Sequence, residues 1–512
     1  MKPAAKKILD DYRRRIETAR VYDVAVRTPL EPARKLSARL ENKVLLKRED
    51  LQPVFSFKLR GAFNKIAKLS EAQRKAGVIA ASAGNHAQGV ALAAKTLHAQ
   101  AWIVMPRTTP SIKVEAVRAL GGHVVLHGDA YDDAATHALE LAREKKLTMV
   151  PPYDDADVIA GQGTVAKEIL EQHAGPLDAV FVCTGGGGLL AGIAAWIKAL
   201  RPSVKVISVE PEDSNCMAAA LAAGRRVELK EVGLFADGVA VKQAGKEPFR
   251  VARHFVDECI TVSVDEICAA VRDVFNECRA VPEPAGALAV AGLKKWVHEK
   301  HVKHKTLVAI VSGANVNFDR LRHVAERAEL GDAHETLLAV TIPEKPGSFK
   351  RFLNHLGRRV ITEFNYRYSS PREAHIFAGI KLGDETGERD AVLKRLRDDG
   401  YPVADLTGNE MAKVHVRYMV GGRAPNLTDE ILLRFEFPER PGACLDFLSA
   451  VGARWNISLF HYRNHGAAYG RVLCGLQVPK AERTECWRSL DALGYRYWDE
   501  TANPAYSLFL GT

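Results

Sequence analysis

Between residues 40 and 320, short apolar runs rich in β-branched residues alternate with longer stretches of helical composition. Alanine-rich stretches such as Ala87–Leu97 and Leu189–Leu200 are typical of the helices. Seven runs have the length and composition of buried strands: Lys43–Lys47, Val78–Ala81, Ala101–Met105, His123–His127, Ala179–Cys183, Val204–Val209 and Leu307–Val311. Because strands that are apolar throughout must be covered on both faces, this alternation predicts parallel twisted sheets flanked by helices, an α/β fold.

Beyond residue 330 the chain contains an internal repeat. Leu338–Gly347 recurs 95 residues later as Leu433–Gly442, and Ile361–Arg367 recurs 96 residues later as Ile457–Arg463. Each copy has the pattern of a strand, a Pro-Gly turn, a helix, two strands, a helix and a strand. The repeat therefore predicts two copies of one α+β module.

These patterns predict three domains. The alternating part covers residues 1–330 and includes a small subdomain at about 50–150. The two modules cover 335–420 and 430–512, and Gly421–Asn426 between them has the composition of a linker. A chain of 512 residues is long enough for each of these domains to bury its own core.

Charge and cysteine usage exclude several classes of function. The 72 basic and 62 acidic residues give a formal net charge of +10, without the basic stripe of a nucleic-acid-binding protein. No window approaches 18 consecutive apolar residues, and Met1–Arg14 has no apolar core, so we expect neither a membrane span nor a secretory signal. Eight widely spaced cysteines without a C-x-x-C pair indicate free thiols in a reducing compartment, the cytoplasm, and no metal site.

The candidate site centres on Lys58, in the run S-F-K-L-R-G that covers Ser56–Gly61. A lone lysine of this kind is usually a surface helix residue. Here, however, three loops rich in glycine or serine each follow a predicted strand, where α/β sheets bind their ligands. These loops are Ser82–His86, Thr184–Leu189 and Ser312–Asn315.

The glycines of the second loop, Gly185–Gly188, predict a phosphate site. Residues without side chains let backbone N–H groups close around an anion at the start of the following helix. The same segment also satisfies a relaxed dinucleotide motif through Gly186, Gly188 and Ala191, and Glu210 follows Gly186 by 24 residues. A nicotinamide cofactor is therefore an alternative, although it gives no role to Lys58.

Together the four elements resemble the serine/threonine dehydratase family of fold-type-II pyridoxal-phosphate enzymes. The blocks S-F-K-L-R-G, S-A-G-N-H, G-G-G-G and S-G-A-N occur in that family's order, and Phe235–Ala240 and Glu283–Ala287 match two further blocks. This resemblance covers most of the first 330 residues and implies a fold like that of the tryptophan synthase β-subunit. The doubled C-terminal module is similar to the ACT-like regulatory modules of the biosynthetic threonine dehydratase branch.

The resemblance also implies the roles of individual residues. Lys58 would carry pyridoxal 5′-phosphate and remove the substrate's Cα proton. The remaining cofactor contacts would be Asn85 at the 3′-oxygen, Ser312 at the ring nitrogen, and Gly185, Gly186, Gly187, Gly188 and Leu189 at the phosphate. Ser82, Gly84 and His86 would receive the substrate carboxylate at a helix start. His86 has a second interpretation, as a residue whose side chain only binds backbone.

The activity implied is loss of water from L-threonine, which gives 2-oxobutanoate and ammonia in the first step of isoleucine biosynthesis. Isoleucine would inhibit the enzyme at the C-terminal modules, valine would oppose it, and the protein would be a homotetramer. Tyr366 and Tyr462 occupy equivalent positions in the repeat and are either effector-binding residues or core aromatics. An amino-acid sensor with an inactive catalytic part is a further hypothesis; it predicts loss of Lys58, Asn85 or Ser312, and all three are present.

Overall fold

The structure is a computed structural model with two compact units, Met1–Gly331 and Asp332–Thr512. It describes residues 3–107, 109, 111–128, 131–318, 320–331, 335–357, 359–368, 370–383, 387–409, 412–413, 416–418, 424, 427–438, 442–451, 454–463, 469–503, 506 and 510. Apart from Ala424, the predicted linker Gly421–Asn426 lies outside the described residues. Among the described helices, none is long and apolar enough to cross a membrane.

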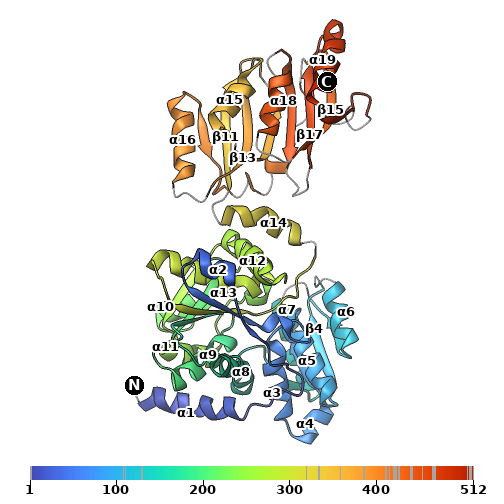
Figure 1. Ribbon diagram of the computed structural model, residues 1–512. Helices are drawn as coiled ribbons and strands as arrows, with labels where there is room; N and C mark the ends of the chain where they lie inside the picture. The colour runs from blue at the N-terminus through green and yellow to red at the C-terminus, as the bar shows by residue number, and fades with distance from the viewer. Residues whose placement is uncertain are drawn as a thin grey trace. The chain divides into compact units, whose positions relative to one another are not determined.

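The first unit contains a six-stranded sheet and a four-stranded sheet (Figure 1). The larger sheet has the order β1 (Leu30–Pro32), β2 (Lys43–Arg48), β10 (Thr306–Val311), β7 (Ala179–Cys183), β8 (Lys205–Pro211) and β9 (Glu258–Val262). The smaller sheet has the order β5 (His123–Leu126), β4 (Ala101–Met105), β3 (Val78–Ala81) and β6 (Thr148–Met149). All pairs are parallel except β1 with β2.

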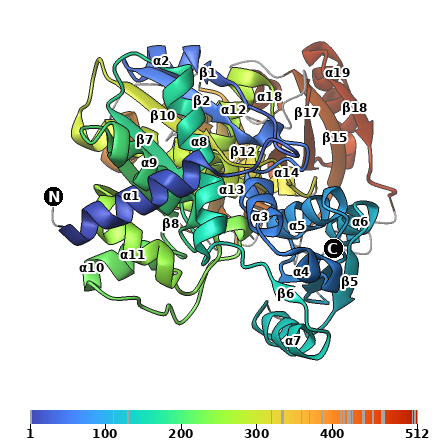
Figure 2. The same ribbon diagram turned by 90° about the horizontal axis from the view of Figure 1, so that it is seen from below.

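The central strands are buried on both faces, as their continuous apolar sequence predicts. Every residue of β7 is buried, so helices cover both sides of the large sheet. Its helices are α1 (Pro3–Glu17), α2 (Arg34–Arg39), α8 (Ala156–Gln172), α9 (Gly188–Leu200), α10 (Cys216–Ala223), α11 (Lys246–Phe255), α12 (Val264–Cys278), α13 (Pro284–Lys300) and α14 (Arg320–Gly331). Figure 2 shows α1 lying across α8 and α9.

The smaller sheet has its own helices and its own core. These helices are α3 (Lys58–Ala67), α4 (Glu71–Ala76), α5 (Asn85–Thr96), α6 (Ser111–Ala119) and α7 (Tyr131–Glu144). Buried residues of α3, α5 and strands β3 and β4 form one hydrophobic cluster, which is separate from the cluster around the large sheet. The first unit therefore has two lobes, one around each sheet.

All seven predicted strands are present; three have the predicted bounds, and the ends of the other four move by one or two residues. Strands β1, β6 and β9 were not predicted. The first two have only three and two residues, so they are too short to carry a hydrophobic pattern. In β9, only two of five residues are buried, which is typical of a strand at the edge of a sheet.

The second unit contains one eight-stranded antiparallel sheet made by both copies of the repeat. The first copy supplies β11 (Glu335–Pro343), α15 (Ser348–Leu356), β12 (Ile361–Arg367), β13 (Glu373–Lys381), α16 (Glu388–Asp398) and β14 (Val403–Asp405). The second supplies β15 (Glu430–Pro438), α18 (Ala443–Val451), β16 (Asn456–Arg463), β17 (Tyr469–Gln477), α19 (Arg483–Leu493) and β18 (Arg496–Asp499). The predicted order of strands and helices is confirmed in both copies, which join where β12 pairs with β16. The Pro-Gly turn of the second copy includes residues 439–441, which lie outside the described residues.

Four charged side chains in the first unit have no solvent exposure and form a buried charge cluster. Two Arg60 nitrogens donate to the Glu49 carboxylate at 2.8 Å, and the third Arg60 nitrogen donates to the Glu168 carboxylate at 2.6 Å. Lys47 donates to Glu168 at 2.6 Å. Burial opposes ionisation of Glu49, but the nearby Arg60 charge outweighs it and lowers the pKa of Glu49. Two positive and two negative groups thus compensate one another in the core.

The buried charge cluster fixes the helix that carries Lys58. Glu49 directly follows β2, Arg60 lies in the first turn of α3, and Glu168 lies on α8. Helices α3 and α8 also approach closely, since a Cβ on Gly161 would lie 2.6 Å from the Arg60 carbonyl oxygen and 2.7 Å from the Gly61 Cα. Strand β2 and these two helices therefore hold one another in a single arrangement.

We predict that Arg60→Ala destabilises the first unit by about 3–5 kcal/mol, because it leaves Glu49 and Glu168 buried without their shared partner. Urea unfolding followed by circular dichroism measures the change. Arg13→Ala is the matched control, since its pair with Glu17 is exposed and should be worth less than about 1 kcal/mol. Equal effects of the two substitutions would contradict this role for the cluster.

Candidate active site

Lys58 is the first residue of α3 and is half-buried. Its Nζ donates to the carbonyl oxygen of Pro152 at 3.2 Å and lies 5.3 Å from the centre of the Phe57 ring. Burial lowers the pKa of Lys58 to about 8, against the attraction of Cys183 and Glu283. Lys58 is therefore an amine that loses its proton much more readily than a surface lysine.

The segment before Lys58 is hydrogen-bonded to the loop that follows β10. The Phe57 N–H donates to the Ser312 carbonyl oxygen at 3.3 Å, and the Ala314 N–H donates to the Phe55 carbonyl oxygen at 2.9 Å. Ser56 also pairs with Gly313 in an isolated antiparallel bridge. Two of the predicted site elements, far apart in the sequence, are thus directly bonded.

The tetraglycine loop joins the end of β7 to the start of α9. Gly187 has a φ of +93°, in the left-handed region that favours glycine. A Cβ on Gly186 would lie 2.3 Å from the Tyr153 ring, and one on Gly187 would lie 2.4 Å from the Met217 Cε. The first N–H groups of α9 have no acceptor within the helix. The loop is therefore a side-chain-free cradle with backbone donors, which suits a phosphate group.

Asn85, the first residue of α5, has both ends of its side chain fixed. Its Nδ2 donates to Glu283 Oε1 at 2.6 Å, and its Oδ1 accepts from Asn315 Nδ2 at 2.6 Å. Burial raises the pKa of Glu283 to about 7. The sequence analysis assigned Glu283 only to a matching block, because nothing in its local pattern shows that it contacts Asn85.

Ser312 follows the last residue of β10 and is 2% exposed. Its hydroxyl donates to the Ala285 carbonyl oxygen at 3.3 Å. It also bonds the thiol of Cys183, whose pKa is raised to about 11 by burial. The group at this position is thus a neutral hydroxyl beside a neutral thiol.

The loop after β3 brings Ser82, Gly84 and His86 to the start of α5. The Gly84 N–H donates to Ser82 Oγ at 3.3 Å, and a Cβ on Gly84 would meet nothing within 4 Å, so open space adjoins the backbone here. His86 Nε2 lies 2.8 Å from the Val150 carbonyl oxygen, which makes Nε2 the protonated nitrogen. Its buried Nδ1 has no partner among the described residues.

The His86 ring is a neutral group within the site. Burial, followed by the nearby Lys58 charge, lowers its pKa to about 3. Of the two interpretations of His86, the ring geometry supports backbone bonding by the side chain. Its main-chain N–H, in the first turn of α5, is still placed to receive an anion.

Within the first unit, the structure brings together the segments that carry Lys58, His86 and Ser312. The charge of Lys58 acts on His86, on Cys183 at the end of β7, and on Glu283. Tyr153 and Met217, which flank the glycine cradle, were missed by the sequence analysis. Each lies in a segment with no motif of its own, so no sequence signal marks them.

The nicotinamide alternative depended on a free acidic group at Glu210. In the structure this carboxylate accepts hydrogen bonds from the N–H groups of Met217 and Ala218 at 2.8 and 2.7 Å, and so caps α10. Burial raises its pKa to about 8. Because Glu210 is occupied as a buried helix cap, the geometry gives it no access to a ribose hydroxyl.

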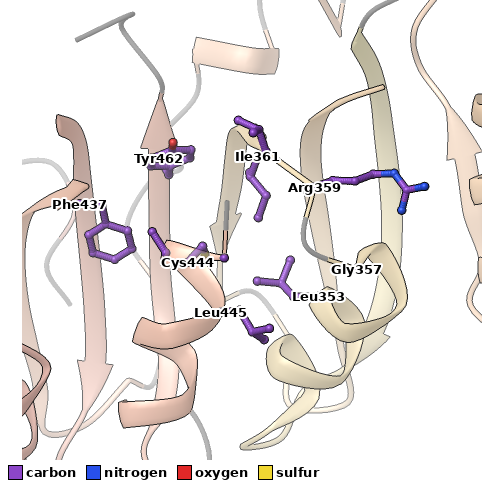
Figure 3. A pocket seen from close by; sticks show the side chains of 11 residues that line it. Leu353, Gly357, Arg359, Ile361, Phe437, Cys444, Leu445 and Tyr462 are labelled. Atoms are coloured by element: carbon purple, nitrogen blue, oxygen red, sulfur yellow. The ribbon is translucent and has the colours of Figure 1, made fainter. Parts of the chain in front are cut away.

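The two candidate effector tyrosines lie in the second unit and are both buried. The Tyr366 hydroxyl donates to the Glu344 carboxylate. Tyr462 lines a pocket between the two copies of the repeat (Figure 3).

Two protein-family models match the chain. The model described as pyridoxal-phosphate dependent enzyme matches residues 21–313. The model described as the C-terminal regulatory domain of threonine dehydratase matches twice, at residues 326–416 and 421–510. The matches fall on the two-lobed unit and on the two copies of the repeat.

Proteins similar to this chain include two bacterial relatives of nearly the same length. The biosynthetic L-threonine dehydratase IlvA of Burkholderia multivorans is 58% identical over 503 residues, which cover 98% of this chain and 99% of the relative. That of Escherichia coli is 54% identical over 500 residues, covering 98% and 97%. Among solved structures, the processed form of threonine deaminase isoform 2 from Solanum lycopersicum aligns with a TM-score of 0.62 and 49% identity, over 62% of this chain and 93% of that one.

We predict that the His86 ring does not titrate between pH 5 and 8 in the folded protein. An unfolded histidine binds a proton near pH 6.5, whereas the folded pKa is about 3. This neutral ring therefore contributes fully to stability above pH 6.5, and the contribution is lost progressively as the pH falls toward 3. Imidazole NMR, with a His86→Asn variant to assign the signal, measures it. A His86 resonance that titrates near pH 6.5 would contradict the buried neutral ring.

Proposed function

The chain belongs to the threonine dehydratase family of pyridoxal-phosphate-dependent enzymes, and we propose that it deaminates L-threonine to 2-oxobutanoate and ammonia. One observation supports this reaction most strongly. A lysine of lowered pKa stands at the start of α3, directly after a segment that is hydrogen-bonded to the Ser312 loop, and its charge acts on His86 and Cys183.

The residues present fit the cofactor. The glycine cradle would hold its phosphate through the backbone of Gly185–Gly188 and the Leu189 N–H, because side chains there would collide with Tyr153 and Met217. Asn85 would bond the 3′-oxygen, and Ser312 would face the ring nitrogen. Pyridoxal phosphate, when bound to an amino group, supplies an electron sink for the bonds at the neighbouring carbon.

Lys58 would act first as the point of attachment and then as the base. With a pKa of about 8, about a quarter of such amines are unprotonated at pH 7.5, against about one in a thousand for an ordinary lysine. Once the substrate amine takes its place, the free Lys58 amine can remove the Cα proton. Its low pKa therefore serves both roles.

Ser312 and the start of α5 would direct the reaction. A neutral hydroxyl does not hold a proton on the ring nitrogen, which disfavours side reactions that need a protonated ring and favours prompt loss of the β-hydroxyl. The N–H groups at the start of α5, together with Ser82, would bind the substrate carboxylate. The product of elimination then tautomerises and hydrolyses, so the water lost is regained when ammonia leaves.

The doubled module would make this activity responsive to a pathway product. We propose inhibition by isoleucine, opposed by valine, through a shift between two states of the enzyme. The pocket beside Tyr462 is lined by both copies of the repeat, with the apolar residues Leu353 and Phe437 and the charged residue Arg359, which supports an amino-acid effector at this place. We also propose a homotetramer in the cytoplasm; the eight free cysteines are compatible with a reducing compartment.

We predict that the purified protein releases equal amounts of 2-oxobutanoate and ammonia from L-threonine. L-Serine lacks one methyl group, so its kcat/KM should be lower by about 10–200-fold. Lys58→Ala should lower turnover at least about 1,000-fold, since it removes the base and the attachment point. Coupled assays of both products measure these effects.

The matched control is Lys65→Ala, on the same helix, where the lysine pairs with Asp155 at 2.7 Å. Its turnover should stay within about twofold of the parent protein, because the half-buried Lys65 side chain pairs with Asp155 and is not among the proposed reacting groups. A product that retains the amine, or full turnover by Lys58→Ala, would overturn the proposal.

A further inference from the structure

A buried carboxylate with no part in the proposed reaction lies against the candidate site. Glu283 directly precedes α13 and is 4% exposed. Its N–H donates to the Gly313 carbonyl oxygen at 3.1 Å, and a Cβ on Gly313 would lie 2.6 Å from Glu283 Oε1. A Cβ on Gly238 would lie 3.6 Å from the same oxygen. The loop after β10 and the short helix η2 (Asp237–Val239) therefore enclose the Glu283 carboxylate.

Asn85 joins Glu283 to Asn315 in a chain of hydrogen bonds. Asn315 Nδ2 donates to the Val54 carbonyl oxygen at 2.8 Å and to Asn85 Oδ1 at 2.6 Å. Asn85 Nδ2 in turn donates to Glu283 Oε1 at 2.6 Å. The chain therefore has an acceptor at each end, a backbone carbonyl oxygen at one and a carboxylate at the other.

These two ends fix the orientation of the Asn85 amide. A carbonyl oxygen and an ionised carboxylate can only accept hydrogen bonds. Asn315 must therefore turn its NH₂ group toward Val54, and Asn85 must turn its own NH₂ group toward Glu283. The described residues accept one of the two Nδ2 hydrogens of Asn85, so the other is available to donate.

The charge of Glu283 is what enforces this orientation. A protonated carboxyl group carries a donor as well as an acceptor, so Asn85 could present either end of its amide to it. Burial, followed by the charge of Asp237, raises the pKa of Glu283 to about 7. The bond from Asn85 and the charges of Lys113 and Lys58 oppose this rise. Glu283 is therefore ionised in most molecules at pH 8.

A residue of the smaller lobe helps to keep Glu283 ionised. Lys113, on α6, pairs with Asp237 of η2 at 2.7 Å. This pair places a positive charge that lowers the pKa of Glu283 beside the negative charge that raises it. Removal of Lys113 would leave the Asp237 charge uncompensated and so favour the protonated form of Glu283.

We propose that Glu283 is a positioning residue for the cofactor, because its carboxylate holds the Asn85 amide with the second Nδ2 hydrogen directed to the cofactor's 3′-oxygen. This inference rests on the proposed binding of pyridoxal phosphate. Glu283 acts through Asn85 and makes no contact of its own with the cofactor. A donor that is already oriented binds an oxygen more tightly than one that must be ordered during binding.

A double-mutant cycle tests this role, with the dissociation constant of pyridoxal phosphate from the full-length protein at pH 8 as its readout. Glu283→Gln keeps the shape of the side chain and an acceptor but removes the charge. It should weaken binding at least about fivefold, since hydrogen bonds to charged groups are the stronger ones. In an Asn85→Ala background the same substitution should stay within about twofold, because no amide remains to be oriented.

The matched control is Glu258→Gln. The Glu258 carboxylate also accepts from a side-chain N–H, that of Trp296 at 3.0 Å, but it lies on β9 and is not among the proposed binding residues. The dissociation constant of this variant should stay within about twofold of the parent value.

The pH dependence of cofactor binding gives a second readout if Asn85→Ala fails to fold. In the parent protein, binding should weaken as the pH falls through about 7 and Glu283 takes up its proton. This step should be absent from Glu283→Gln and should move to higher pH in Lys113→Ala. Cys183, a further titratable group that Glu283 acts on, has a pKa of about 11 and stays neutral in this range. The cofactor phosphate titrates in every variant, so the difference from the parent curve is measured.

Equal effects of Glu283→Gln in the two backgrounds would overturn the inference, as would a pH step that Glu283→Gln retains or that Lys113→Ala leaves in place. A parent protein that binds no pyridoxal phosphate would overturn the proposed function as well. Tight binding that is indifferent to Glu283→Gln would overturn the role of Glu283 alone.

Discussion

The buried charge cluster joins three elements that are distant in the sequence and fixes the start of α3, where Lys58 lies. Arg60 lies two residues after Lys58, and its guanidinium is held by Glu49 after β2 and Glu168 on α8. Charges without solvent exposure are tolerated only when they are paired and bonded, so this arrangement permits few alternatives. The position of Lys58 relative to both lobes follows from it.

Backbone, rather than charged side chains, supplies most of the proposed binding groups. The cradle of Gly185–Gly188 and the start of α5 present N–H groups, and His86 is neutral. Lys58 is therefore the one side chain among the proposed binding residues that can carry a positive charge, and burial lowers its pKa. An anionic ligand and a basic amine can be accommodated together because helix starts provide partial charges without titrating.

Strand composition and loop chemistry allowed much of the fold and site to be predicted. The runs that became β3, β4 and β7 are apolar and uninterrupted, and each site loop follows a strand, so their clustering at sheet ends could be inferred. The partners of Asn85 could not be predicted, because Glu283 and Asn315 are distant from it in the sequence and contact it only in the folded chain. Neither the Tyr366–Glu344 hydrogen bond nor the pocket beside Tyr462 could be predicted, because each joins separate elements of the second unit.

The central claim is that Lys58 carries pyridoxal phosphate. Reduction of the holoenzyme with borohydride, followed by peptide mapping, tests it most directly, because reduction fixes the cofactor to the amine that holds it. The account predicts that the label lies on the peptide containing Lys58 and that the visible absorption of the protein changes when L-threonine is added. A label on another lysine, or a colourless protein that binds a nicotinamide cofactor instead, would contradict it.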